Sequence, residues 1–417
     1  RSPLSEQRKA TNKNKVIMLN LSKFISTHVT NRNESMFAED IRKNTDALTK
    51  RINSKSVLVI GGAGTIGSSY IQALLTFEPK SLVVVDINEN GLTELTRDLR
   101  STNGIVVPEE YITYPMSYSD PVFYKMFRER NGFDIVANFS AHKHVRSEKD
   151  RFSVEALINN NIINAKGLLD VLQEYPPKHF FCVSTDKAAN PVNIMGGSKK
   201  VMEDMIMTYS KKYPVTTARF ANVAFSNGSL PAGFLERISK GQPISAPKDV
   251  TRYFVSPEES GQICLLACMV GKTGEIYFPK LRKEQVMTFS DMANKLLKEY
   301  GFEVNECTSE IEAINESQGI IKEKYPVYYS NSDTTGEKAY EEFYTEAEEV
   351  DLERHNSLGV VINLKPREMS EIDLLLKQLK QAFDNLDTTK ADIVKIMKDF
   401  LVNFDHKEVG KSLDSKM

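Results

Sequence analysis

An acidic and a basic residue stand next to each other at Asp186 and Lys187, just after the apolar segment 179–183. A carboxyl group and an amine in this position could give and take a proton in one reaction, while the Thr185 hydroxyl binds the substrate. As a base, Lys187 would need a pKa lowered by burial or by a neighbouring cation. The alternative is an ordinary ion pair on a surface loop. A position at the carboxyl end of a central strand, where parallel sheets bind ligands, favours the chemical interpretation.

A short glycine-rich stretch follows the apolar segment 57–60 and leads into a predicted helix. Its first glycine allows a tight turn, its second lets the backbone approach a pyrophosphate, and its third lets the helix pack against the strand. The helix N-terminus then faces the negative charge. The residues expected to bind a dinucleotide in this way are Gly61, Gly64, Thr65, Ile66 and Gly67.

Asp86 ends the next predicted strand, 19 residues beyond Gly67. Its carboxylate suits a bidentate contact with the hydroxyls of an adenosine ribose. No arginine follows Asp86 before Arg97, so the pattern favours NAD over NADP.

Met195 and Lys199 are four residues apart in the segment after Lys187, so in a helix they share one face. Lys199 could bind the nicotinamide ribose. Methionine cannot transfer a proton, so the deprotonation of a substrate hydroxyl would pass to Asp186 directly, or through water to Lys199.

Three other polar features are less specific. His142 and His144 have no evident cysteine or carboxylate partner nearby, so no metal site is predicted. Asn161 either bends a helix and holds a structural water, or belongs to an exposed run of three asparagines. The four cysteines show no C-x-x-C spacing and are typical of a reducing cytosol, so we expect a cytoplasmic protein.

From residue 57 onward, short β-branched segments alternate with amphipathic helical patterns, which predicts an α/β fold with a doubly wound parallel (Rossmann) sheet. The predicted strands are 56–60, 81–86, 111–114, 134–138, 179–185, 215–220 and 274–278. The predicted helices are 66–76, 90–99, 122–130, 153–174 and 198–212.

Four regions are expected along the chain. Residues 1–54 form a helical extension, either a collar on the main domain or a solvated linker. Residues 55–225 form the nucleotide-binding domain, whose last strand comes from about 274–279, and 226–365 form mainly a smaller substrate-binding domain. In the tail, 366–417, two amphipathic patterns at 371–383 and 388–402 would pack on the body or on a neighbouring subunit.

Composition narrows the class of protein. The 417 residues carry a formal net charge of −2, which gives no reason to expect a nucleic-acid partner. No apolar run approaches the roughly 20 residues of a membrane span, and no signal peptide is evident, so no membrane segment is expected in the chain as given.

The chain resembles the UDP-N-acetylglucosamine 4,6-dehydratases of the capsular-polysaccharide branch of the extended short-chain dehydrogenases, over roughly residues 40–350. Related enzymes keep a Tyr-x-x-x-Lys pair, of which this chain has Lys199, with Met195 in place of the tyrosine. The resemblance rests on six blocks in order, which are the glycine turn and residues 143–145, 184–191, 219–223, 251–254 and 336–342.

The resemblance implies a mechanism. Hydride would leave sugar C4 for NAD, and the resulting 4-ketone would acidify the C5 proton. Lys187 would remove that proton and Asp186 would protonate the departing C6 hydroxyl. Hydride would then return to C6, giving a UDP-4-keto-6-deoxy sugar and regenerating NAD. The residues implied to bind the UDP-sugar are Lys143, His144, Asn222, Arg252 and Glu337.

The chain departs from the family pattern at several positions. Ser117 stands where an aspartate near adenine is usual, Ala221 replaces a glycine, and Thr334 stands where arginine is common. Met195 resembles a subgroup that retains the C5 configuration. A homo-oligomer is expected, and the exact sugar and nucleotide stay open.

Two other functions are considered. A nucleotide-sugar 4-epimerase would need the ketone but no acid–base pair for water loss, so Asp186 and Lys187 favour the dehydratase. In a non-catalytic NAD-binding scaffold, both residues would be replaceable without consequence.

Overall fold

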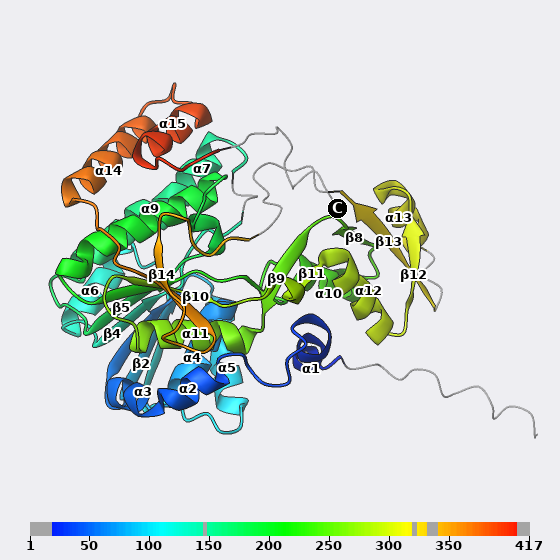
Figure 1. Cartoon of the computed structure of the whole chain (residues 1–417), viewed down its shortest axis with the longest axis horizontal. Helices are drawn as coiled ribbons and strands as arrows, with labels where there is room; N and C mark the ends of the chain where they lie inside the picture. The colour runs from blue at the N-terminus through cyan, green and yellow to red at the C-terminus, as the bar shows by residue number, and fades with distance from the viewer. Residues whose placement is uncertain (1–18, 145–147, 319–322, 332–340, 407–417) are drawn as a thin grey trace, which may run out of the picture.

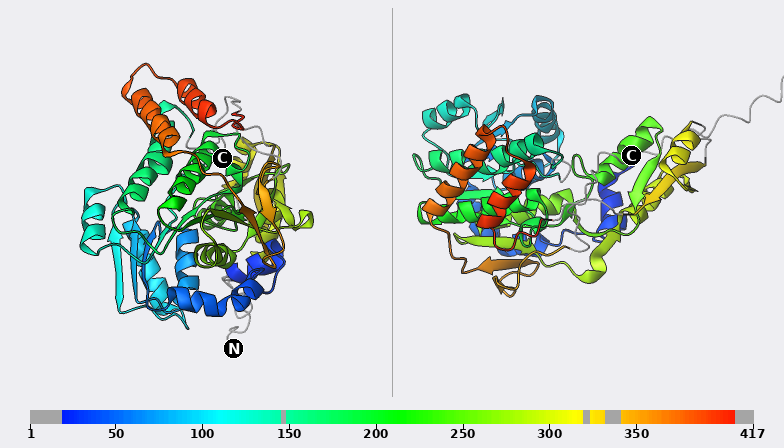
Figure 2. Two further views of the ribbon diagram at one scale, coloured as in Figure 1. Left: turned by 60° about the vertical axis from the view of Figure 1, so that its left-hand side comes forward. Right: turned by 90° about the horizontal axis from the view of Figure 1, so that it is seen from above.

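The computed structural model describes residues 19–144, 148–318, 323–331 and 341–406, and every structural statement below refers to these residues. They form a large body around one sheet and a smaller part that projects from it (Figures 1 and 2). Glu337, Val145 and Thr334 lie outside the described residues.

The large sheet has nine strands in the order β14-β15-β10-β6-β5-β4-β1-β2-β3. The strands from β3 to β10 are parallel, whereas β15 and β14 are antiparallel additions at one edge. Apolar residues fill these strands because helices cover both faces of the sheet. The bounds are β1 Ser56–Ile60, β2 Ser81–Asp86, β3 Glu110–Pro115, β4 Ile135–Asn138, β5 His179–Val183, β6 Val215–Ala218, β10 Glu275–Pro279, β14 Glu349–Asp351 and β15 Leu358–Ile362.

Two hydrophobic cores lie on opposite faces of this sheet. One is covered by α6 (Pro121–Glu129), α7 (Arg151–Ile158), the π-helical segment η3 (Asn159–Asn164), α8 (Ala165–Val171) and α9 (Ile194–Thr208). The other is covered by α3 (Thr45–Ile52), α4 (Thr65–Leu75), α5 (Glu89–Ser101) and α11 (Pro257–Met269). Short 3-10 turns lie at η4 (Asp186–Ala188), η5 (Tyr209–Lys211) and η6 (Lys283–Gln285). The prediction of a doubly wound parallel sheet is confirmed.

The smaller part contains two three-stranded sheets and a third hydrophobic core. One sheet joins β7 (Asn222–Val223), β9 (Thr251–Val255) and β11 (Val286–Thr288), and the other joins β8 (Ile244–Pro247), β12 (Glu303–Cys307) and β13 (Lys324–Ser330). Its helices are α10 (Leu230–Lys240), α12 (Phe289–Glu299) and α13 (Glu310–Ser317). The region predicted as mainly this part, 226–365, also supplies α11, β10, β14 and β15 to the large body.

The N-terminal segment joins the two parts. In α1 (Leu21–Phe24) and the π-helical segment η1 (Ile25–Val29), Phe24, Ile25 and Val29 enter the core of the smaller part. After α2 (Ala38–Lys43), helix α3 packs on α11 of the body. Residues 21–29 thus pack on the smaller part, whereas α3 packs on the body.

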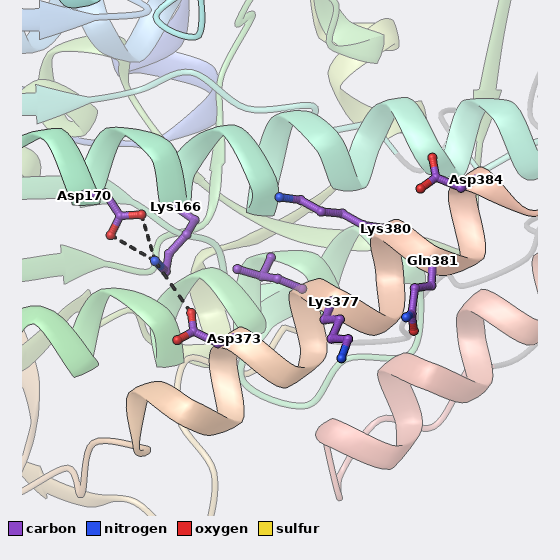
Figure 3. A pocket seen from close by; sticks show the side chains of 8 residues that line it. Lys166, Asp170, Asp373, Lys377, Lys380, Gln381 and Asp384 are labelled. Carbon is purple, nitrogen blue, oxygen red and sulfur yellow. Dashed lines mark hydrogen bonds and ion pairs between the residues drawn. The ribbon is translucent and has the colours of Figure 1, made fainter.

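The C-terminal tail forms two helices, α14 (Met369–Asp384) and α15 (Lys390–Phe400), as predicted. They lie against α9 at the outer face of the body, in orange and red in Figures 1 and 2. A groove between α14 and α8 is lined mostly by charged side chains, and in it Lys166 pairs with Asp170 and Asp373 (Figure 3). None of the predicted site residues lines this groove.

Candidate functional site

The glycine turn forms a tight cradle between β1 and α4. Gly61 has φ +75°, and a Cβ on it would lie 2.7 Å from the backbone nitrogen of Ser140. A Cβ on Gly67 would lie 2.3 Å from the carbonyl oxygen of Gly61. At Gly64 a Cβ would come no nearer than 3.5 Å to the protein, so this position leaves room above the turn.

Gly64 is also the N-cap residue of α4 and has no side chain to cap the helix. The first N–H groups of α4, at Thr65 and Ile66, therefore point out of the helix end, where an anion would be stabilised. The Thr65 hydroxyl oxygen accepts the Asn227 N–H at 2.9 Å, which brings the loop after β7 to this helix end.

Asp86 ends β2 beside the glycine turn, as predicted. Its carboxylate accepts the Ala63 N–H at 3.0 Å and the Asn88 N–H at 2.9 Å. Each oxygen of a carboxylate has further acceptor capacity, so both can still accept ribose hydroxyls. The cradle, the helix end and Asp86 together suit a dinucleotide.

Asp186 and Lys187, the predicted acid–base pair, lie in η4, just beyond the carboxyl end of β5. The ammonium of Lys187 lies 3.1 Å from Asp186 Oδ1, and the Thr185 hydroxyl donates to the same oxygen at 2.7 Å. Asp186 is buried, whereas the Lys187 side chain is 28% exposed. A surface ion pair would have both partners in water, so the geometry favours the chemical interpretation.

Met195 and Lys199 lie in the first two turns of α9, and both are buried. The Lys199 ammonium donates to the Val183 carbonyl at 2.7 Å, so it lies at the carboxyl end of β5. Burial lowers the pKa of Lys199. The helix begins at Ile194, four residues before its predicted start, and so includes both residues of the pair.

Asn161 lies in the π-helical segment η3 with 2% of its surface exposed, so the interpretation as part of an exposed run is wrong. Its side-chain oxygen accepts the His142 N–H at 2.8 Å. Its amide donates to the His142 carbonyl and to the Ser198 hydroxyl, each at 3.0 Å. Asn161 thus joins the loop after β4 to the helix of Met195 and Lys199.

The predicted substrate residues fall into two groups. Lys143 donates to the Asn227 carbonyl at 3.1 Å, and His144 lies beside Gly228, so both contact the loop near Thr65. Asn222 in β7 and Arg252 in β9 lie instead on the small sheet near η4. Arg252 is buried and donates to the Thr251 carbonyl at 2.8 Å.

Glu341 was missed as a site residue, although it stands in the last block of the family resemblance. Its carboxylate accepts the Asn222 amide at 2.5 Å and the Tyr253 N–H at 2.7 Å. Burial and the negative charge of Asp186 raise the pKa of Glu341 to about 8. A carboxyl with a strongly shifted pKa next to other charged groups is typical of functional sites.

Two negative findings accompany the site. The described part of the chain holds no cluster of three side chains of the metal-ligating types. Among the helices described here, none is long and apolar enough to cross a membrane.

Comparisons with known proteins agree with the fold. The family of polysaccharide biosynthesis proteins matches residues 57–363. An uncharacterized membrane protein of Methanocaldococcus jannaschii is 31% identical over 315 residues, covering 74% of this chain and 85% of that protein. The solved structure of Pen from Bacillus thuringiensis has a TM-score of 0.58 at 22% identity, covering 79% of this chain and 99% of that one.

Relatives with assigned roles are more distant. A UDP-N-acetylglucosamine 4,6-dehydratase (inverting) of Campylobacter jejuni is 27% identical over 258 residues, covering 58% of this chain and 71% of that enzyme. The probable polysaccharide biosynthesis protein EpsC of Bacillus subtilis is 28% identical over 285 residues. The alignment covers 67% of this chain but 46% of EpsC, so the chain spans about half of that protein. Since the family match extends over most of the chain, the protein belongs to the polysaccharide biosynthesis protein family.

Proposed function

We propose that this protein is a nucleotide-sugar 4,6-dehydratase that converts UDP-N-acetylglucosamine to a UDP-4-keto-6-deoxy-N-acetylhexosamine. The observation that carries the proposal is the contact of Asp186 and Lys187 at the carboxyl end of β5, close to Lys199. Membership of the polysaccharide biosynthesis family and the similarity to the Campylobacter enzyme support it.

NAD is the proposed cofactor, and the residues present fit it. The crowded turn at Gly61 and Gly67, with space left at Gly64, would hold the pyrophosphate against the α4 N-terminus. Asp86 would bind the adenosine ribose, and Lys199 the nicotinamide ribose. When bound, the nicotinamide would take a hydride from the sugar and later return it.

The acid–base pair accounts for the movement of protons. If Asp186 takes the proton of the C4 hydroxyl during oxidation, it is already protonated for the next step. It can then give this proton to the C6 hydroxyl, which leaves as water. Lys187 takes the proton from C5, which the C4 ketone acidifies, and returns a proton to C5 at the end. The net loss is one water.

With methionine at position 195, another group must accept the proton of the C4 hydroxyl, because a methionine cannot. Asp186 is the direct candidate. The second route runs through a water to Lys199, whose lowered pKa favours the neutral amine that such a relay needs. Asn222 and Arg252 are the proposed contacts of the UDP-sugar, and the arginine suits a diphosphate by its fork geometry. We also propose that the C5 configuration of the sugar is retained.

The first test is mass spectrometry of UDP-N-acetylglucosamine incubated with the protein and NAD in deuterated water. The expected product is lighter by one water and carries deuterium at C5. An isomer that retains its water would indicate an epimerase instead. An unchanged substrate, followed by no reaction across a panel of sugar nucleotides, would contradict the proposal.

Variants separate the two roles. Asp186→Asn should stop the reaction before water loss, and Lys187→Ala should abolish exchange of the C5 hydrogen with solvent. The matched control is Lys178→Ala, because Lys178 pairs with Asp134 at 2.8 Å just before β5 and β4 begin, at the amino ends of these strands and so at the opposite end from Asp186 and Lys187. Full dehydration by Asp186→Asn, or retained exchange in Lys187→Ala, would remove that residue from its role.

A further inference from the structure

Glu341 lies where three separate parts of the chain meet. Its two carboxylate oxygens accept the side-chain amide of Asn222 in β7 and the backbone N–H of Tyr253 in β9, at 2.5 and 2.7 Å. The charges of Asp186 and Lys187 in η4 act on it from the other side. Glu341 therefore lies between the proposed acid–base pair and the strands that carry Asn222 and Arg252, the proposed contacts of the sugar nucleotide.

The segment that carries Glu341 is firmly held. Arg219, with no exposed surface, donates to the Phe343 carbonyl at 3.0 Å and forms a two-pronged ion pair with Glu348 at 2.8 Å. The neighbouring Glu342 accepts the Asn190 amide at 3.1 Å. These contacts fix the backbone on the C-terminal side of Glu341, so the position of its carboxyl is built into the fold.

The charged groups that face Glu341 oppose one another. Burial and the carboxylate of Asp186 raise its pKa, while Lys187, Arg252 and the Tyr253 N–H hold it lower. The net result is a pKa of about 8, so the carboxyl of Glu341 takes up a proton at a higher pH than an ordinary glutamate does. An ionised Glu341 would place a second negative charge beside Asp186.

We infer that Glu341 is a positioning residue of the proposed dehydratase, whose carboxyl holds the Asn222 side chain and the Tyr253 backbone in place beside Asp186 and Lys187. This inference rests on the proposed function. Ionisation of Glu341 at alkaline pH adds a second negative charge beside Asp186, which opposes the negative charge that develops on the sugar as the C5 proton leaves. Turnover therefore falls on the alkaline side.

The first experiment does not depend on turnover. In protein labelled with ¹³C at the glutamate side-chain carboxyl carbons, one resonance should titrate near pH 8. That resonance should be absent from Glu341→Gln and present in the control Glu342→Gln, whose carboxyl is the adjacent one in the sequence. A Glu341 resonance that titrates at an ordinary glutamate pKa, near 4.3, would overturn the inference.

The second experiment compares the pH dependence of kcat/KM. The wild type should lose activity above about pH 8, and Glu341→Gln should lose this alkaline limb while keeping activity at pH 7 within about tenfold of wild type. The glutamine is uncharged and keeps one acceptor oxygen for Asn222 or Tyr253. Glu341→Leu, which keeps neither hydrogen bond, should lose at least tenfold more at pH 7.

The outcomes separate the two proposals. An alkaline limb that is unchanged in Glu341→Gln would overturn the role of Glu341, even with an active dehydratase. Loss of the limb in that variant alone, with Glu342→Gln like wild type, would support it, because a merely structural role would not move the pH profile. A wild type inert toward every sugar nucleotide would refute the proposed function, and with it the role in catalysis, whereas the carboxyl titration would still establish the charge of Glu341.

Discussion

Glu148 holds the N-terminus of the helix that carries Met195 and Lys199. Its side chain is buried, and its two carboxylate oxygens accept the Ile194 N–H at 3.0 Å and the Met195 N–H at 2.8 Å. These are two of the four N–H groups that a helix leaves without an internal partner. The Glu148 carbonyl accepts Lys390 of the C-terminal tail at 2.8 Å. The perturbation that tests this arrangement is Glu148→Gln.

Glutamine has one acceptor oxygen where glutamate has two, so one buried N–H loses its partner. A hydrogen bond to a charged group contributes about 1.5–3 kcal/mol. A negative charge at a helix N-terminus contributes about 0.3–1 kcal/mol more. We therefore expect the free energy of unfolding to fall by about 2–4 kcal/mol.

Thermal unfolding followed by circular dichroism measures this loss. For a domain of about 150–250 residues, each kcal/mol lowers Tm by roughly 2–4 °C, so Glu148→Gln should lower Tm by roughly 4–16 °C. Glu129→Gln, on the exposed face of α6, is the control and should leave Tm within about 1 °C of wild type. A Tm of Glu148→Gln equal to that of the control would refute the capping role.

Three further predictions concern the body. Gly67→Ala should abolish NAD binding in a calorimetric titration, because its Cβ would meet the Gly61 carbonyl at 2.3 Å, whereas Gly233→Ala meets nothing within 4 Å and should bind as wild type does. Burial lowers the pKa of His179 to about 3, so the unfolded state binds one more proton as pH falls below about 6.5. Urea unfolding should show that His179→Gln loses stability less steeply between pH 6 and 4, by about 1.4 kcal/mol per pH unit. Arg219→Met should cost about 3–5 kcal/mol in the same assay, because it leaves buried carboxylates without their cation.

The large sheet could be predicted from the sequence because its signal is local. Strands such as β1 and β2 are short β-branched runs, and their predicted bounds match the structure at both ends. The prediction placed the ends of β5 and β6 two residues too far along the chain, because residues 184–185 and 219–220 continue the pattern beyond the last paired residues, Val183 and Ala218. Beyond these residues the chain turns into η4 after β5 and toward β7 after β6.

The start of α9 could not be placed because two glycines obscured it. Gly196 and Gly197 are poor helix formers, so the prediction began at Ser198. In the structure both serve close packing. A Cβ on Gly196 would lie 2.6 Å from the Lys187 carbonyl, and one on Gly197 would lie 2.9 Å from Met397 of the tail. Tertiary contacts thus outweigh the local preference.

The contacts of Glu341 depend on partners 119 and 88 residues away in the chain, at Asn222 and Tyr253. No local pattern reveals such partners, although its place in a block of the family resemblance could have marked it. Asn161 posed the opposite difficulty, because a run of three asparagines suggests exposure, whereas in the structure this one lies buried in a π-helical segment.

The C-terminal tail lies beyond the matched family region, which ends at residue 363. It nevertheless contacts the loop between Lys187 and Met195. Asn403 donates to the Ala189 carbonyl, and the Asp405 N–H donates to the Pro191 carbonyl, each at 3.1 Å. Residues 189–191 join η4, with Asp186 and Lys187, to α9. Glu148 is held by the same tail through Lys390. The tail, for which the sequence pattern predicted only packing, therefore also contacts the loop that joins Asp186 and Lys187 to Met195 and Lys199.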